Sequence, residues 1–363
     1  MIQASIKYLK KKPIAFLLLA LPLAILAEVN HWPPLWIFAL SALGVIPLAY
    51  YIGASTEALA HYTGPRLGGL LNATLGNAAE LIITIAAIRA GLLELVKASI
   101  TGSILGNLLL VLGMSMLFGG IRNGIQTFDR RQASSNAILL VLSVLILLIP
   151  SLLSPYIGDI VQPSPKVETL SLGVAAVMII IYVLGLVFSH TAFKGLGTQE
   201  IVEVSTAGPV WTVRNSIIVL GLSTLGVAYL SEILVGAVEP IVASLGISEF
   251  FIGIIFIPLI GNVAEHLVAV QVAIKNKMTL SVEIAVASSL QIALFVAPVL
   301  VFISLLMGNP LTLVFNQFEY LALGVGVLIT ALVSEDGESN WLEGAELLAL
   351  YIILALAFFL LPA

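Results

Sequence analysis

Long apolar stretches without charge constrain this sequence more than any other feature. A helix that crosses a bilayer needs about 20 mostly apolar residues. Charged residues make up only 10% of the chain, against about 25% in soluble domains, so they cannot cover a globule in water. We therefore predict an all-α integral membrane protein with eleven transmembrane helices, at 14–29, 35–61, 67–92, 95–119, 132–153, 169–190, 212–243, 247–274, 278–307, 316–334 and 341–361.

The same composition excludes several classes of function. The chain has no cysteine, which excludes disulfides, thiolate metal sites and cysteine nucleophiles. A net charge of −5 without a long basic run gives no sign of a nucleic-acid partner, so the lipid bilayer is the expected surrounding. The first apolar stretch follows "KYLKKK", but no small-residue cleavage site follows it, and we interpret it as a helix rather than a signal peptide.

The basic residues predict the orientation of these helices, because Lys and Arg gather in cytoplasmic loops. With a cytoplasmic N-terminus, only three of the 15 Lys and Arg residues fall on the outer side, namely Arg89, Lys97 and Lys166. An odd number of helices then places the C-terminus outside. This distribution favours a prokaryotic plasma-membrane protein, with the vacuolar membrane as the alternative.

One polar motif occurs twice within the apolar sequence. "LGNAAELIITI" at 75–85 is answered by "IGNVAEHLVAV" at 260–270, at an offset of 185 residues. Three pairs of residues match: Gly76 and Gly261, Asn77 and Asn262, and Glu80 and Glu265.

The neighbouring stretches repeat as well. "TGSILGNLLLVLG" from Thr101 corresponds to "VASSLQIALFVAP" from Val286 at the same offset. The matched positions there are Ser103 with Ser288 and Gly106 with Gln291. Upstream, "STEAL" at 55–59 resembles "LSEIL" at 230–234, which pairs Glu57 with Glu232.

Because five helices is an odd number, two successive five-helix units have opposite orientations in the membrane. The pattern therefore predicts an N-terminal helix followed by two inverted five-helix repeats, an architecture typical of secondary transporters. We assign 1–34 to the N-terminal tail and first helix, 35–190 to the first repeat, 191–211 to a cytoplasmic linker and 212–363 to the second repeat.

The repeated glutamates lie deep in their helices. Glu80 is fourteen residues from both Arg66 and Glu94, or roughly 20 Å from either polar end at ~1.5 Å per residue. A charge at such depth costs at least ~2.5 kcal/mol and usually serves a function. The alternative is a protonated Glu that hydrogen-bonds a neighbouring helix, but a matched pair favours the functional interpretation.

The residue types around these glutamates favour a hard cation. Asn and Glu three positions apart share one helical face, so two facing motifs would bring carboxylates, amides and hydroxyls together. Calcium takes six to eight such oxygen ligands. The absence of thiols and the single nearby imidazole, His266, argue against soft metals. Our candidate ligands are Asn77, Glu80, Ser103, Asn262, Glu265, Ser288 and Gln291.

The same carboxylates can couple cation transport to protons. Once the cation leaves, two facing carboxylates repel each other and lack solvation, so they bind protons instead. Competition for one site is sufficient for exchange, provided that the empty charged site cannot change sides. Candidates for the proton route or for gating are Glu57, Glu232 and His266, and the alternative for the first two is a solvated vestibule without a role.

Glycine and proline residues predict two local features. Gly102-x-x-x-Gly106 predicts a close approach of this helix to its neighbour. Pro258, one turn before Gly261, lacks a backbone N–H and frees a carbonyl near the motif.

These residues resemble a known family. "GNAAELIITIAAIRAG" with "GSILGNLLLVLG", and "GNVAEHLVAVQVAIKNKMTL" with "ASSLQIALFVAPVLVF", are similar to the two conserved repeat regions of calcium/proton exchangers of the calcium/cation antiporter superfamily. The resemblance implies a central cation site formed by the Asn and Glu of both motifs, the Ser of the helices that follow and the Gln of the second. It also implies a role in ion movement for Glu57 and Glu232. Gly106 departs from the small polar residue frequent in relatives.

Other functions were weighed against this one. A sodium-coupled calcium exchanger of the same superfamily is the nearest alternative, although its motif typically carries a Pro before the Glu. A divalent cation channel would normally build its filter from a ring of subunits or parallel repeats. An enzyme is disfavoured because the four His residues are scattered and no Gly-x-Ser-x-Gly or His-Glu-x-x-His pattern occurs.

We therefore predict an antiporter that exchanges cytoplasmic Ca2+ for protons, with no cofactor and Ca2+ as its transported substrate. A monomer can contain the full site. The sequence leaves open the choice between Ca2+ and Mn2+ or other cations, the stoichiometry and the oligomeric state.

Overall fold

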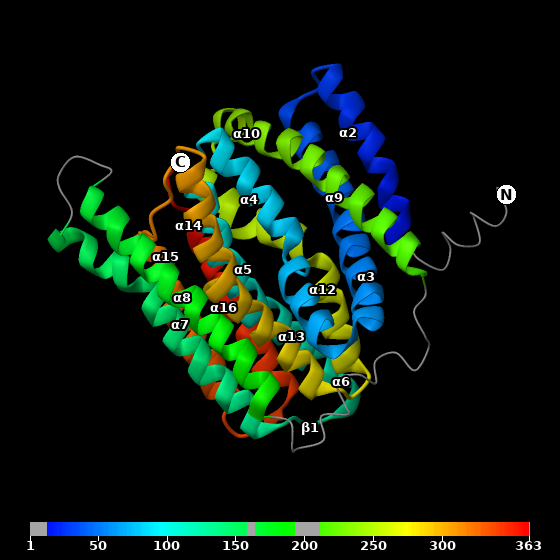
Figure 1. Cartoon of the computed structure of the whole chain (residues 1–363), viewed down its shortest axis with the longest axis vertical. Coiled ribbons are helices and arrows are strands. Elements are labelled where there is room, and N and C mark those ends of the chain that lie inside the picture. Colours follow the sequence, from blue (N-terminus) through cyan, green and yellow to red (C-terminus); the bar gives the residue numbers. More distant parts are fainter. Residues whose placement is uncertain (1–12, 158–163, 193–210, 363) are drawn as a thin grey trace.

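A computed structural model describes residues 13–157, 164–192 and 211–362 (Figure 1). The predicted N-terminal tail up to residue 12 and most of the 191–211 linker lie outside the described residues, together with their Lys residues.

The described chain is almost wholly helical. Its first half contains η1 (Pro13–Leu19), α2 (Ala20–Val29), α3 (Pro34–Leu75), α4 (Ala78–Ala90), α5 (Leu93–Leu105), η2 (Gly106–Val111), α6 (Leu112–Asn123), α7 (Arg130–Ile157) and α8 (Pro165–Ala192). Its second half contains α9 (Val213–Gly236), α10 (Val238–Leu245), α11 (Glu249–Phe251), η5 (Ile252–Phe256), α12 (Ile257–Ile274), α13 (Met278–Gln291), η6 (Ile292–Val296), α14 (Ala297–Leu306), α15 (Gln317–Val333) and α16 (Trp341–Phe359). Two short strands, β1 (Gln126–Thr127) and β2 (Glu338–Ser339), pair antiparallel.

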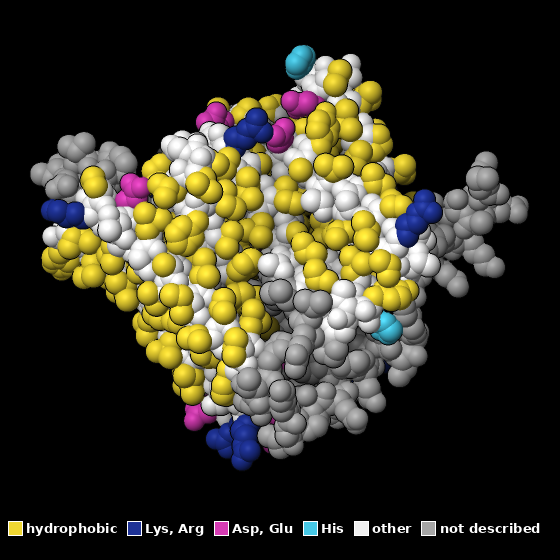
Figure 2. Space-filling view, in the orientation of Figure 1, with side chains coloured by type: hydrophobic (Ala, Val, Ile, Leu, Met, Phe, Trp, Pro, Cys, Tyr) yellow, Lys and Arg dark blue, Asp and Glu magenta, His cyan; other side chains and the backbone are white. Residues whose placement is uncertain are grey.

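Eight helical segments are long and apolar enough to cross a membrane, and two shorter apolar helices accompany them, Phe16–Val29 and Gln317–Val333. The face shown in Figure 2 is largely covered by apolar side chains, and its charged side chains lie mostly towards the two ends of the molecule. The expected all-helical architecture with apolar spans is thus confirmed, while the count of eleven crossings stays a prediction.

The stretch predicted as one helix over 67–92 is broken. Helix α3 continues from the preceding stretch through a kink at Gly64, where φ is 79°, and ends at Leu75. Gly64 tolerates this left-handed backbone because it lacks a Cβ. The chain then turns at Gly76 and Asn77 before α4 begins. Helix α12, in contrast, runs through Gly261 without a break.

Three segments adopt the wider π-helical turn: η2, η5 and η6. Such segments often lie at functional sites. The segments η2 and η6 occupy matching places in the two halves, directly after the polar residues of α5 and α13. Pro258 follows η5 by two residues, and Pro298 follows η6 by two residues. A proline forfeits one helical hydrogen bond, and the wider turn accommodates that loss.

The two motif helices run in opposite directions between the ends of the bundle, which we call the α10 end and the β1 end (Figure 1). Helix α4 finishes at the α10 end, where Arg89 meets Glu232 of α9. Helix α12 finishes at the β1 end, where Gln126 Nε2 donates to the carbonyl of Ala273 at 2.9 Å.

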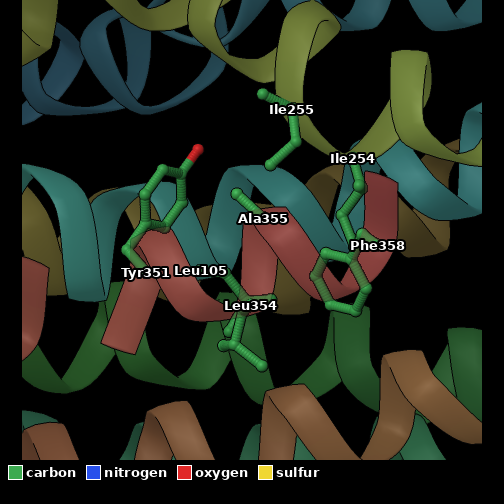
Figure 3. Close-up of a pocket in the computed structure, with 7 residues that line it drawn as sticks. All are labelled: Leu105, Ile254, Ile255, Tyr351, Leu354, Ala355 and Phe358. Atoms are coloured by element: carbon green, nitrogen blue, oxygen red, sulfur yellow. The ribbon is translucent and has the colours of Figure 1, made fainter. Parts of the chain in front are cut away.

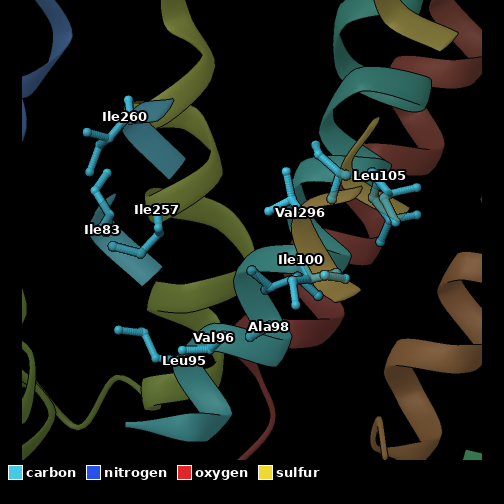
Figure 4. Packing of buried hydrophobic residues seen from close by; sticks show 14 of the residues in the cluster. Ile83, Leu95, Val96, Ala98, Ile100, Leu105, Ile257, Ile260 and Val296 are labelled. Carbon is cyan, nitrogen blue, oxygen red and sulfur yellow. The ribbon is translucent and has the colours of Figure 1, made fainter. Parts of the chain in front are cut away.

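Close packing of aliphatic side chains surrounds these helices. Ile83 of α4 and Ile257 and Ile260 of α12 belong to one buried cluster with residues of α5 (Figure 4). Lipid tails are as apolar as these side chains, so helix association in a membrane depends on close contact rather than on the hydrophobic effect.

Gly102 provides the closest approach. A Cβ at this position of α5 would overlap the carbonyl oxygen of Ile254 and lie 2.7 Å from Pro258 Cγ. The predicted packing role is confirmed for Gly102. For Gly106 the prediction was wrong, because a Cβ there would meet nothing within 4 Å; this residue begins η2 instead.

Candidate cation site

The two Gly-Asn-x-x-Glu motifs meet where α4 and α12 cross. A Cβ on Gly261 would lie 2.9 Å from Glu80 Cγ, and a Cβ on Gly76 would lie 3.6 Å from Glu265 Oε1. Each motif glycine therefore leaves room for the glutamate of the other motif. The carboxylates of Glu80 and Glu265 are near enough to repel each other.

The first motif is sealed from solvent. Asn77 is 0% exposed and Glu80 2% exposed, and Glu265 is half-buried. Both carboxylate oxygens of Glu80 and Oδ1 of Asn77 lack a hydrogen bond. Buried polar atoms without a partner are costly and rare in native proteins. A bound cation would satisfy these oxygen atoms.

Hydrogen bonds from α13 orient the motif side chains. Asn77 Nδ2 donates to Gln291 Oε1 at 2.7 Å, which leaves Asn77 Oδ1 free to act as a ligand. Ser288 Oγ donates to Glu265 Oε2 at 3.0 Å. The structure thus joins Asn77 to Gln291 and Glu265 to Ser288, one pair on each motif.

Asn107 is a site residue that sequence reasoning missed. It lies in η2, is 1% exposed, and donates from Nδ2 to Ser288 Oγ at 3.0 Å. The signal was present, because Asn107 follows Ser103 by four residues and such residues share a helical face. A constant offset paired Gly106 with Gln291 instead, and the extra residue in the turn of a π-helix rotates this face by about one position.

The structure places the other predicted residues less directly. Ser103 is buried on α5 at 3% exposure, but none of the hydrogen bonds among the described residues joins it to another candidate. Asn262 is 2% exposed, and its Nδ2 lacks a partner. His266, next to Glu265 in sequence, is 6% exposed and its Nε2 lacks a partner too.

The two outlying glutamates do not reach the central cluster. Glu57 is exposed on α3. Glu232 on α9 forms an ion pair with Arg89, with 2.8 Å between Glu232 Oε1 and Arg89 Nη1, and its side chain is 59% exposed. Any role for these residues is therefore at the periphery of the site.

The ligand set excludes a transition-metal centre. No group of three or more His, Cys, Asp or Glu side chains suited to a metal occurs among the described residues. A cation between α4 and α12 would be held by two carboxylates and by amide and hydroxyl oxygens, the ligands of hard cations such as Ca2+. The pocket in Figure 3 is no rival site, because Tyr351 Oη is its only polar side-chain atom; its lining is Leu105, Ile254, Ile255, Tyr351, Leu354, Ala355 and Phe358.

Comparison with known proteins agrees with this geometry. The family described as "Sodium/calcium exchanger protein" matches residues 33–191 and 215–360. The chain belongs to this family. Its membership confirms the resemblance seen in the two motifs.

Exchanger relatives match along almost the whole chain. A protein of Aphanothece halophytica named "Ca(2+)/H(+) antiporter" is 45% identical, covering 98% of this chain and 98% of its own. A protein of Bacillus subtilis (strain 168) named "Ca(2+)/H(+) antiporter ChaA" is 43% identical, covering 96% and 99%. The solved structure described as native YfkE is 40% identical, with a TM-score of 0.84 over 96% of this chain and 99% of that one.

Proposed function

We propose that this exchanger is a secondary active transporter that moves Ca2+ out of the cytoplasm in exchange for protons. The observation that carries the proposal is the buried pair of Glu80 and Glu265, presented by antiparallel motif helices with oxygen atoms that lack partners. The relatives named as Ca2+/H+ antiporters support the same activity.

The cation would bind between the two motifs. The carboxylates of Glu80 and Glu265 neutralise the two charges of Ca2+, and Asn77 Oδ1 and the amide oxygen of Asn262 supply further ligands. Ser103, Ser288 and Gln291 complete the set or orient it. Asn107 acts through Ser288, whose hydroxyl holds one oxygen of Glu265.

Protons replace the cation on the same carboxylates. With Ca2+ absent, two like charges in a buried site repel each other, so protons bind as the ion leaves. The site is then neutral either with Ca2+ or with two protons. The empty charged site is costly to move through a low-dielectric barrier, and transport in the two directions is thereby coupled. No cofactor takes part, and the protein is no enzyme.

Alternating access would follow from two inverted repeats in an eleven-helix chain, with repeats at 35–190 and 212–363. The two family-matched ranges and the opposite directions of α4 and α12 support this division. We propose that the β1 end faces the cytoplasm, as the N-terminus does, and that the α10 end faces outward. The basic residues support this orientation, and a prokaryotic plasma membrane is the proposed location, with a vacuolar membrane as the alternative.

The peripheral residues would carry protons or control access. Glu57 and Glu232 lie on α3 and α9, the helices beside the motif helices. His266 places a buried imidazole nitrogen next to Glu265 in the chain. A monomer can contain the whole site.

The experiment is Ca2+ uptake into inside-out vesicles with an imposed pH gradient, for wild type, Glu80→Gln and Glu265→Gln. Gln keeps the size and loses the charge and the titratable proton. The control is Glu346→Gln, which removes an exposed carboxylate on α16. We expect uptake driven by the pH gradient without sodium in wild type and in the control, and none in either site variant. Uptake that needs sodium would instead establish the sodium-coupled alternative, and uptake that persists in both site variants would refute the shared site.

A further inference from the structure

Two asparagines bind the motif helices into one unit. Asn309 Nδ2 donates to the carbonyl of Ile88 near the end of α4 at 3.0 Å. Asn123 Nδ2 donates to the carbonyls of Ala273 at 3.4 Å and Ile274 at 3.2 Å, at the end of α12. Side chains that satisfy the last carbonyls of a helix hold its end in place.

These two caps correspond to each other. Ile88 and Ala273 are 185 residues apart, the offset of the motifs. In each case the asparagine comes from the end of the second core helix of the other repeat. Helices α4, α5, α6, α12, α13 and α14 are therefore fastened to each other at both ends of the bundle, and we call them the core unit. Helices α3 and α9 pack against this unit from outside it.

At the α10 end, one charged contact fastens α9 to the core unit. Arg89 Nη1 lies 2.8 Å from Glu232 Oε1, and this is the sole ion pair among the described residues. Arg89 belongs to the last turn of α4, directly before Gly91, whose backbone is left-handed with φ of 82°.

The β1 end has the matching residues without the contact. Asn276, 185 residues after Gly91, has the same left-handed backbone with φ of 61°. Lys275 precedes it, one position after the residue that matches Arg89. Glu57 on α3 corresponds to Glu232 on α9. Both Glu57 and Lys275 are exposed, and neither forms an ion pair with a described side chain.

We propose that Arg89 and Lys275 are gating residues that act alternately. In the conformation described, Arg89 and Glu232 hold the α10 end closed; in the opposite conformation this pair separates, and Lys275 pairs with Glu57 to hold the β1 end closed. Inverted repeats change access by rocking one group of helices against the other about a fixed site, so a contact at one end predicts its counterpart at the other. The proposal rests on the proposed alternating access and not on which ions are exchanged.

Exposed ion pairs are suited to this use because they are weak. Each shifts an equilibrium by only ~2- to 5-fold, so a gate of this kind biases the conformation and still opens. Removal of one pair should therefore shift the population towards the opposite conformation rather than stop transport.

The experiment measures the access of a cysteine reporter, and the chain has no cysteine of its own. Thr84, one turn from Glu80 towards the α10 end and 3% exposed, is replaced in Thr84→Cys. A membrane-impermeant maleimide is added at the α10 side of oriented vesicles. We expect Arg89→Gln and Glu232→Gln to raise the labelling rate about 2- to 5-fold, and Glu57→Gln and Lys275→Gln to lower it.

Two further variants separate gating from a general structural effect. Glu239→Gln removes another exposed carboxylate at the α10 end and should leave the rate unchanged. The exchanged pair Arg89→Glu with Glu232→Arg should restore the parent rate. Equal labelling in the parent and both single variants, or an exchanged pair that labels like the single variants, would overturn the proposal. Labelling requires no transport, so this result is independent of the Ca2+ uptake experiment.

Discussion

Gly261→Ala tests whether the contact between the two motifs sets the geometry of the site. The added Cβ would lie 2.9 Å from Glu80 Cγ and 3.4 Å from its carboxyl carbon Cδ. Since carbon atoms pack at about 3.5–4.0 Å, Glu80 would have to move by at least ~0.6 Å. Its carboxylate would be displaced from the position that faces Glu265.

The cost follows from overpacking. Forcing a methyl group into a packed site costs about 1–3 kcal/mol, and each 1.4 kcal/mol is a tenfold change in affinity. We therefore expect the apparent affinity for Ca2+ to fall by roughly 5- to 100-fold. The substitution should otherwise suit the α-helix, in which Ala is favoured over Gly.

The assay is the Ca2+ concentration dependence of uptake in vesicles driven by a pH gradient, with the melting temperature of the purified protein as a measure of folding. Gly173→Ala in α8 is the matched control, because a Cβ there meets nothing within 4 Å. A folded Gly261→Ala protein whose KM for Ca2+ lies within twofold of wild type would refute the proposed contact.

Four further outcomes are expected. Asn107→Ala should raise the KM for Ca2+ several-fold because Ser288 loses its donor, and an unchanged KM in vesicle uptake would contradict the role given to Asn107. Asn123→Ala should lower the stability by about 1 kcal/mol, since the carbonyls of Ala273 and Ile274 lose their cap; thermal unfolding in detergent measures this, and no shift would argue against the core unit. Gly102→Val should prevent folding or reduce the yield severely, because its Cβ overlaps the carbonyl of Ile254; normal yield of folded protein would show that α5 can move away. Ca2+ binding should release protons and weaken on acidification, because protons and the ion compete for Glu80 and Glu265; calorimetry in two buffers of different ionisation enthalpy would reveal the absence of proton release.

The sequence was sufficient for the repeated motif because polar residues stand out in an apolar chain. Glu80 and Glu265 at one offset predicted two helices that face each other, and the structure brings Gly76 to Glu265 and Gly261 to Glu80. The bond from Asn77 to Gln291 likewise joins two predicted candidates.

The remaining features depend on backbone geometry that periodicity does not encode. A π-helical turn inserts one residue into a helix, and for that reason a constant offset selected Gly106 and missed Asn107. The break at Gly76 and Asn77 in the first motif, with none in the second, could not follow from two nearly identical sequences. The partner of Glu232 is 143 residues away, and only the packing of α9 against α4 reveals it.

The mutual caps of the core unit have a consequence for biosynthesis. Asn309 is made 221 residues after Ile88, whose carbonyl it binds. At about 5–20 residues per second, translation needs roughly 10–40 s to cover that interval. During this time the first repeat contains Glu80 and an uncapped helix end, and the second motif does not yet face it. The newly inserted half must therefore wait in the membrane with an unfinished polar centre, and the ribosome completes the site only with the last third of the chain.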